Sequence, residues 1–202
     1  IQNIFKKKNT IYADIGTNEG NFLDFLNSFC NFKKIICFEP IKELTDKIDI
    51  KKYPNKILIH NIALSNNNSI KNFYQYDISS QSSLYQQKNL FKSLKKLKKK
   101  FKVKTIKFDD KFKNYRNIDF CKIDVQGEEW NVLQGMKKSL INKKIKLIKI
   151  EISFIERYRG SKSNFLSIIN YLSKSSYYLI SISKIKYLKN KILLMDAYFQ
   201  IK

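Results

Sequence analysis

The sequence predicts an α/β fold whose doubly wound, mostly parallel sheet ends in an antiparallel hairpin. Short apolar runs typical of strands alternate with helix-like segments along most of the chain, which indicates βαβ units. A turn with two glycines follows the first apolar run, where the first strand-to-helix connection is expected. The last two apolar runs are separated by a short basic turn, which predicts the hairpin.

The first part of the chain follows this alternation closely. Residues 11–15 form an apolar run and are predicted as a short buried strand. Residues 21–29 place five apolar side chains at helical spacing, which favours a helix. The segments that follow are predicted as a strand over 34–38, a helix over 41–50 and a strand over 56–60.

The middle of the chain departs from the alternation. Residues 70–76 alternate like an edge strand, and 77–83 form a polar loop. Residues 86–101 place an apolar stripe opposite a lysine face, which predicts a helix that either covers the substrate or simply lies on the solvated surface. A strand over 103–108 follows. We expect the region around 70–108 to be a substrate-side insertion.

Regular alternation resumes in the last part of the chain. No repeat and no linker rich in Gly, Pro or Ser interrupts it, so residues 1–202 are expected to form a single domain. The predicted elements are strands over 118–125 and 145–152, helices over 128–141 and 164–173, and hairpin strands over 177–183 and 191–201.

Composition narrows the class of protein. No apolar stretch approaches the ~20 residues of a membrane span, and no secretory signal opens the chain, so we expect a cytoplasmic protein. The three cysteines have no metal-ligand spacing and are expected to be reduced. The formal charge of +23 allows a nucleic acid or an anionic membrane as partner. Almost all cations are lysine, and residues with codons rich in A and T, such as Ile, Asn, Lys, Tyr and Phe, are abundant. Drift in genome composition is therefore the preferred explanation of the charge.

A turn motif points to a bound cofactor. Asp14, Gly16, Asn18 and Gly20 lie between the first strand and helix, where backbone N–H groups and a helix start face a ligand. Asn18 tolerates the left-handed backbone of such a turn. Glu39 ends the second strand, where a carboxylate can accept hydrogen bonds from ribose hydroxyls. A purely structural turn is the alternative, but the combination favours a ribose-bearing cofactor.

Carboxylates follow the later strands as well. Asp124 ends one predicted strand and Glu151 lies near the end of the next, so both are expected at the rim that holds the turn. They are candidates for a general base, a cation site or the orientation of a substrate hydroxyl. Glu128 and Glu129 begin a helix, where the macrodipole favours negative charge, and for Glu128 this structural interpretation is preferred.

Four further polar residues are weaker candidates. His60, the only histidine, is expected to be structural. Asn61 follows it on the side where an adenine would lie and is a candidate cofactor contact. Ser82 and Ser83 lie in a polar loop, where serines usually serve the loop alone.

Together these motifs resemble, in the same order, those of the FkbM-type methyltransferases. The resemblance covers roughly residues 10–155 and rests on the segments 14–20, 38–40, 61–64, 82–84, 108–110, 122–129, 133–135 and 150–152. It implies a class I, Rossmann-like domain that uses S-adenosylmethionine. It further implies O-methylation of a hydroxyl on a sugar, a glycan or a related natural product.

The resemblance also assigns roles to residues. It makes the loop from Asp14 to Gly20 the cradle of the methionine end and Glu39 the ribose ligand. It places Asp124 and Glu129 beside the transferred methyl, and it puts Ser82 and Ser83 on a family motif, which makes them candidate cofactor contacts. Asp124, with Glu129 or Glu151, is our candidate for the catalytic base. The sequence departs from the family at two positions, because Gln126 stands where Glu is usual and Glu128 where a small residue is usual.

Two other functions stay open at this stage. An RNA methyltransferase would explain the charge, but the Pro-Pro-aromatic signature common in base-amine methyltransferases is missing after the strand that ends at Asp124. A non-catalytic basic binding module on the same fold is the alternative from another class. The sequence leaves the need for a divalent metal undecided.

Overall fold

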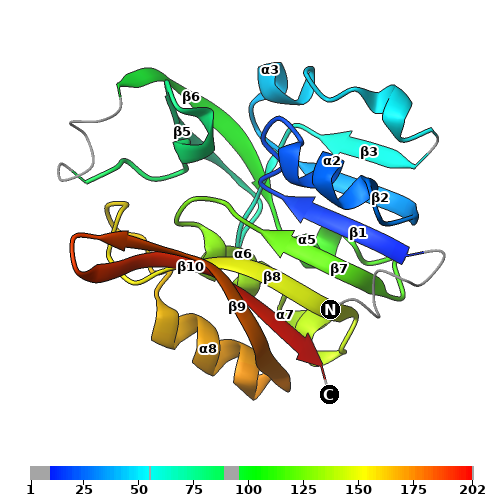
Figure 1. Cartoon of the computed structure of the whole chain (residues 1–202). Helices are drawn as coiled ribbons and strands as arrows, with labels where there is room; N and C mark the ends of the chain where they lie inside the picture. The colour runs from blue at the N-terminus through cyan, green and yellow to red at the C-terminus, as the bar shows by residue number, and fades with distance from the viewer. Residues whose placement is uncertain (1–9, 55, 89–95, 202) are drawn as a thin grey trace.

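A seven-stranded sheet organises the molecule (Figure 1). The computed structural model describes residues 10–54, 56–88 and 96–201. Within them the strand order is β3-β2-β1-β7-β8-β10-β9, with parallel pairing from β3 to β8 and antiparallel pairing at β10. This confirms the predicted fold class. The strands are β1 (Thr10–Ile15), β2 (Phe32–Phe38), β3 (Ile57–His60), β7 (Ile118–Ile123), β8 (Ile145–Ser153), β9 (Tyr177–Leu188) and β10 (Lys191–Ile201).

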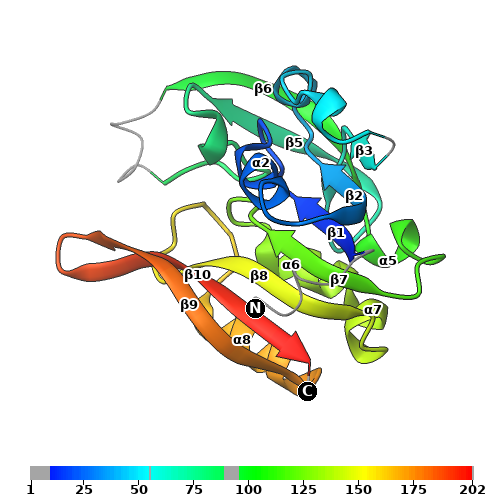
Figure 2. The same cartoon turned by 45° about the vertical axis from the view of Figure 1, so that its right-hand side comes forward.

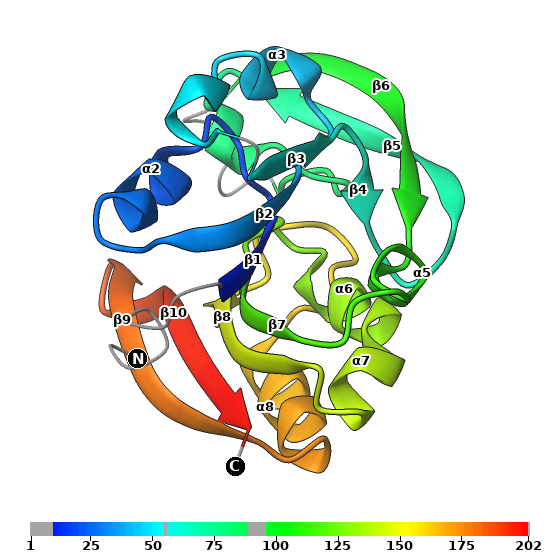
Figure 3. The same ribbon diagram turned by 90° about the vertical axis from the view of Figure 1, so that its right-hand side faces the viewer.

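Side chains alternate between the two faces of the sheet along each strand. Both faces are buried, which explains the near-continuous apolar runs. Tyr12 of β1 and Ile35 of β2 pack with Leu23 of the helix α2 (Asn21–Asn27) on one face. Their neighbours Ala13 and Ile36 pack on the other face, and Figure 3 shows helices on both sides. The second face is covered by α5 (Phe108–Lys111), α6 (Glu129–Gly135), α7 (Lys137–Ile141) and α8 (Phe165–Lys174), with α8 behind the closing hairpin in Figure 2.

A second, three-stranded sheet stands beyond the carboxyl ends of the central strands (Figure 1). Its order is β4-β6-β5. Phe73 of β5 and Val103 of β6 face inward and pack against Ile41 beside the short helix α3. The elements are β4 (Ala63–Leu64), β5 (Ser69–Tyr76), β6 (Leu97–Ile106) and α3 (Lys42–Thr45).

The prediction of a helix over residues 86–101 is wrong for those residues of the segment that the structure describes. Residues 89–95 of that segment lie outside the described residues, and Gln87 forms an isolated β-bridge with Tyr158. From Leu97 onward the chain is the strand β6, paired antiparallel with β5. Lysines also recur with a period of two at positions 98, 100, 102 and 104, although Lys99 interrupts the alternation. Pairing with β5 selects that period over the helical one.

Smaller differences concern the ends of elements. The helix predicted over 128–141 is split into α6 and α7 at Met136, and the one predicted over 41–50 is reduced to α3, with a 3-10 turn at Ile50–Lys52. The hairpin of β9 and β10 forms as expected. The cysteines are free and buried. Among the described residues, no helix is both long and apolar enough to cross a membrane.

Candidate functional site

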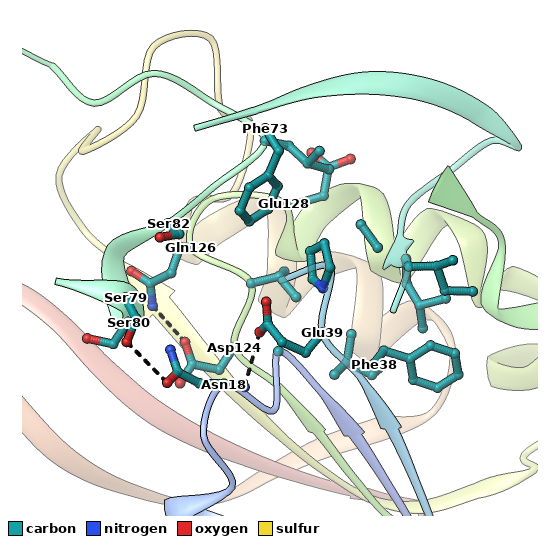
Figure 4. Close-up of a pocket in the computed structure, with 18 residues that line it drawn as sticks. Asn18, Phe38, Glu39, Phe73, Ser79, Ser80, Ser82, Asp124, Gln126 and Glu128 are labelled. Carbon is teal, nitrogen blue, oxygen red and sulfur yellow. Dashed lines mark hydrogen bonds between the residues drawn. The ribbon is translucent and has the colours of Figure 1, made fainter. Parts of the chain in front are cut away.

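A pocket opens where the order of the sheet reverses, between the carboxyl ends of β1 and β7. This rim pocket holds about 600 Å³ of empty space, part of it open to solvent. One side of it is apolar and the other polar (Figure 4). Its apolar lining includes Phe38, Ile62, Leu64 and Phe73, and its polar lining includes Asn18, Glu39, Ser79, Ser80, Ser82 and Asp124.

Gly16 lets the first turn pass directly over the end of β7. Its φ is +81°, and a Cβ on it would lie 1.9 Å from the backbone oxygen of Asp124. Its N–H donates to the carbonyl oxygen of Phe38 at 2.9 Å. No side chain fits this position, so the turn is held tightly between the ends of β2 and β7. Asn18 then takes the left-handed conformation expected of it, with φ of +54°.

Glu39 directly follows β2, and its buried carboxylate lines the rim pocket. Oε2 accepts the N–H of Asn18 at 3.1 Å, and Oε1 accepts the N–H of Ile41 at 3.0 Å. Burial raises the pKa of Glu39 to about 7, and these two hydrogen bonds limit the rise. A carboxylate has room for about four hydrogen bonds, so this group can hold the turn and still accept hydroxyl donors from a ligand.

Asp14 lies beneath the turn rather than in the pocket. Its carboxylate is fully buried, and Oδ1 lies 3.1 Å from Nζ of Lys122. The same ammonium donates to the carbonyl oxygen of Gly16 at 2.8 Å. Burial would lower the pKa of Lys122, but the carboxylates of Asp14 and Asp124 raise it above the ordinary value. The pair therefore anchors the turn, and direct contact of Asp14 with a cofactor stays a prediction.

The amide of Gln126 joins Asp124 and Glu151. Its Nε2 donates to Asp124 Oδ1 at 2.7 Å and to Glu151 Oε1 at 3.1 Å. Its Oε1 accepts Arg157 at 3.1 Å and the hydroxyl of Tyr158 at 2.8 Å. Arg157 also lies 3.0 Å from Glu151 Oε1. The two carboxylates that the sequence places at the rim are thus held by one neutral side chain, as Figure 4 shows for Asp124.

The surroundings push the pKa values of these carboxyls apart. Burial raises the pKa of Glu151 to about 7, and the nearby charge of Asp124 adds to the rise while Arg157 opposes it. Burial acts on Asp124 too, but Lys122, Lys149 and the amide of Gln126 outweigh it and lower the pKa. Near neutral pH, Asp124 is ionised, while Glu151 is divided between its two protonation states.

Glu129 and Glu128 point in different directions. Glu129 is buried, and its carboxylate accepts the N–H groups of Val125 and Gly127, each at 3.1 Å from Oε1. It shapes the loop after β7 and is not part of the rim-pocket lining. Glu128 does line the pocket, and it is buried against Lys71 at 2.9 Å. The sequence predicted only a helix-end role for Glu128, and the structure shows in addition that it forms a buried ion pair.

Among the weaker candidates, Ser82, Ser83 and Asn61 differ in their position relative to the rim pocket. Ser82 lines the rim pocket, and its Oγ accepts the N–H of Tyr76 at 3.2 Å. Ser83 is buried and donates to the carbonyl oxygen of Gln126 at 2.6 Å, so it joins two loops. Asn61 donates to Thr45 Oγ1 at 2.8 Å and lies outside the rim-pocket lining. Cofactor contacts by Ser83 and Asn61 stay predictions.

A second hollow adjoins the first. It contains about 920 Å³ of empty space, part of it open, and shares Ser80, Asp124 and Gln126 with the rim pocket. The β9–β10 hairpin forms its far wall, so we call it the hairpin pocket. Its charged lining consists of Lys122, Lys149, Arg157, Lys184, Lys186, Asp124, Glu151 and Asp196. The rim and hairpin pockets meet at Asp124.

Sequence reasoning missed several residues of this site. Lys122 opens the segment 122–129, but no local pattern indicates its pairing with Asp14, and none indicates that of Arg157 with Gln126, because these partners lie far away in the chain. Lys149 is a charge inside an apolar strand, which is a usable signal for a buried ion pair. In the described part of the chain, no group of three or more His, Cys, Asp or Glu residues is placed to hold a metal ion.

Comparisons with known proteins agree on the fold. The model of the methyltransferase FkbM domain matches residues 14–179, whereas the sequence matches none of the curated proteins. An FkbM methyltransferase from Methylobacillus flagellatus KT has a TM-score of 0.60 and 17% identity, covering 95% of this chain and 43% of that one. This chain thus spans less than half of that protein's length.

Two other solved structures contain the cofactor or its product. TrmK from M. capricolum, in complex with S-adenosyl-homocysteine, has a TM-score of 0.51 and 14% identity, covering 98% of this chain and 66% of that one. Sp1610 from Streptococcus pneumoniae, in complex with S-adenosyl-L-methionine, has a TM-score of 0.55 and 9% identity, covering 99% and 71%. At these identities the likeness shows the fold alone.

Proposed function

The chain belongs to the FkbM methyltransferase family, and from this premise we propose that it transfers a methyl group from S-adenosylmethionine to a hydroxyl of a sugar, a glycan or a related natural product. The observation that carries the proposal is that two pockets meet at Asp124. One has the apolar and acidic lining that suits a nucleoside, and the other is lined by charged groups suited to a polar acceptor. Residues 1–202 are proposed to form one domain. Of the region around 70–108, Ser80 and Gln81 line the hairpin pocket and would face the substrate, whereas Phe73 and Ser79 line the rim pocket.

The rim pocket fits the cofactor. The buried carboxylate of Glu39 would bind the ribose hydroxyls, and the apolar wall that includes Phe38 and Phe73 would receive the adenine. Asn18 and Ser79, joined by a hydrogen bond of 3.2 Å, would border the methionine end. When bound, S-adenosylmethionine supplies a methyl group activated by the sulfonium charge.

Asp124, where the two pockets meet, and Glu151 of the hairpin pocket would have different roles in the reaction. Asp124 stays ionised and would hold positive charge at the point where the pockets meet. Glu151, whose pKa of about 7 suits a general base, would take the proton of the acceptor hydroxyl at Oε2, because Gln126 and Arg157 both bind Oε1. Alignment of the acceptor can supply about 7–11 kcal/mol in addition.

Glu129 is proposed as a positioning residue. Both of its carboxylate oxygens accept the N–H of Gly127, and Oε1 also accepts that of Val125. It would therefore hold the backbone next to Asp124 in place. Contact with the reacting atoms is not part of this proposal.

Transfer of labelled methyl from S-adenosylmethionine into fractionated glycan, small-molecule, lipid and RNA pools tests the proposed function. We expect label in a glycan or small-molecule fraction, and we expect Asp124→Ala to abolish it. Label in RNA alone would replace the proposal with an RNA methyltransferase. Calorimetry with S-adenosylmethionine is the companion measurement, since no binding at tens of micromolar would leave only a non-catalytic binding module.

A further inference from the structure

We propose that the acceptor carries an anionic group, a phosphate or a carboxylate, and that Lys184 and Lys186 of β9 bind this group in the hairpin pocket. The inference rests on the proposed function, because it assigns the hairpin pocket to the acceptor. It names a substrate class that the fold alone leaves open. Three features of the pocket lead to it.

The first feature is a surplus of positive charge. The hairpin pocket is lined by five cationic and three acidic side chains. Lys149 Nζ lies 2.8 Å from Asp196, and Arg157 lies 3.0 Å from Glu151, so two of the acids have buried cationic partners.

The third acid, Asp124, lies 3.9 Å from Lys122. Lys184 lies 3.9 Å from Asp196, which Lys149 already binds more closely, and 64% of its side chain is exposed. Among the described residues, no carboxylate lies within 4.0 Å of the ammonium of Lys186. Two cations at the open side of the pocket are therefore available to a ligand.

The second feature is a bulge that places Lys184. Ser183 pairs with Asp196 and Lys186 pairs with Leu194, so two residues of β9 oppose Met195 alone. Lys184 is one of the two, and its φ is +51°. A left-handed lysine is unfavourable, and a bulge of this kind redirects a side chain. Here it brings the ammonium to 5.8 Å from the ring centre of Phe22, which lies across the pocket on α2.

The third feature is the surface between these charges. Phe22 lines the hairpin pocket, and Lys149 lies 5.2 Å from its ring centre. An aromatic face suits the apolar face of a sugar ring, while Glu151 suits its hydroxyls. Lysines at the outer edge would then meet a phosphate or carboxylate on the same molecule. The groups that line the pocket are therefore complementary to a phosphorylated or acidic sugar.

Lysine is abundant everywhere in this chain, so exposure alone is no evidence for such a site. Position distinguishes Lys184 and Lys186 from the exposed lysines of β6. Both line the pocket that shares Asp124 with the rim pocket, whereas Lys98 and Lys102 line neither the rim pocket nor the hairpin pocket. Lys98 and Lys102 therefore provide a matched control.

The test is calorimetric titration of the full chain with three probes in the presence of S-adenosylhomocysteine. The probes are glucose 1-phosphate, glucuronate and neutral methyl glucoside. At least one anionic probe should bind about tenfold more tightly than the neutral one. The K184Q/K186Q protein should lose about that factor for the anionic probe alone, and K98Q/K102Q should lose nothing. The two anionic probes distinguish phosphate from carboxylate.

Cofactor binding distinguishes a failure of the proposed function from a failure of the anionic acceptor. Each variant is also titrated with S-adenosylmethionine, and we expect an unchanged affinity. If the wild-type chain does not bind the cofactor, the proposed function fails. If it binds the cofactor but binds the three probes equally, or binds neither anion below about 10 mM, the anionic acceptor is wrong while the methyltransferase remains. Equal anion affinity in K184Q/K186Q also overturns the inference.

Discussion

The lysines at the rim of the central sheet differ sharply from those on β6. Lys122 and Lys149 have side chains only 6% and 2% exposed, and each binds a buried carboxylate, Asp14 or Asp196. The lysines of β6 are all exposed, and Lys98, Lys100, Lys102 and Lys104 share the face of the strand opposite Phe101 and Val103. In the first region an ion pair stabilises the loops around a pocket. In the second, side chains face water.

The high positive charge of the chain therefore comes from two kinds of lysine. A buried ion pair leaves an uncompensated charge when one partner is removed, whereas an exposed lysine leaves little behind. The net charge of +23 therefore mixes residues on which the site depends with residues that are consistent with compositional drift. Substitutions in the two regions are therefore expected to differ in cost.

Gly16→Ala should have the largest effect. Its Cβ would lie 1.9 Å from a backbone oxygen of Asp124, in addition to the strain of a left-handed alanine. We expect a loss of more than about 4 kcal/mol in the free energy of unfolding, measured with urea. Gly160→Ala is the control, because it shares the left-handed backbone but meets nothing within 4 Å, and about 1 kcal/mol is expected there. Equal losses would refute the close packing of the turn.

Lys122→Met should cost about 3–5 kcal/mol of stability, because it leaves the buried carboxylate of Asp14 without its partner. Lys102→Met on β6 should change stability by no more than about 0.5 kcal/mol. Adding Asp14→Asn to Lys122→Met should restore part of the loss, since the unpaired buried charge of Asp14 is then removed. Similar values for the two lysines would remove the contrast between the regions.

Glu151→Gln should lower kcat about 100-fold and leave the affinity for S-adenosylmethionine nearly unchanged. For the wild-type enzyme, kcat should rise with pH through about 7, because a base with this pKa acts in its ionised form. The variant should lose that rise. The assay is initial-rate methyl transfer between pH 6 and 8, and an unaltered profile in the variant would show that Glu151 is not the base.

Glu39→Gln should weaken cofactor binding about tenfold at pH 8 and abolish its dependence on pH. In the wild-type protein the affinity should increase as pH rises through about 7, because the ionised carboxylate accepts ribose hydroxyls better. Stability should change in the opposite sense. The folded-state pKa lies above the ordinary value of 4.5, so this group's stabilisation is complete below pH 4.5 and is lost as pH rises through about 7.

Calorimetry at pH 6, 7 and 8 checks these expectations for Glu39. Glu43→Gln on α3 is the matched control, because its side chain is exposed and lies outside the rim pocket. It should bind the cofactor like the wild type at every pH. Unchanged binding by Glu39→Gln would remove the ribose assignment.

Replacing four lysines of β6 together should have the smallest effect. Neutralising Lys98, Lys100, Lys102 and Lys104 as glutamines should change cofactor affinity and methyl transfer less than about twofold, because surface charges contribute little. Filter binding to RNA, with and without these substitutions, is the second readout. Tight, salt-sensitive RNA binding that disappears in the variant would show that the β6 lysines have a partner.

Much of the fold could be predicted because its signals are local. The apolar runs of β1 and β2, the turn that contains Gly16 and the carboxylates after the strands are all short segments of sequence. Parallel strands bring their carboxyl ends to one edge, so Glu39 and Asp124 were expected at the same rim, and both line the rim pocket. Their roles toward the cofactor and the acceptor stay predictions.

The remaining features depend on contacts between segments that are distant in the sequence. Lysine and apolar residues after position 96 suit either a helix or a strand, and pairing with β5 chose the strand. The partners Asp14 and Lys122 lie 108 residues apart, and Gln126 meets Arg157 across 31 residues. Local patterns therefore determined the turn and the strand ends, whereas the charges that hold the site depend on long-range contacts that no local pattern specifies.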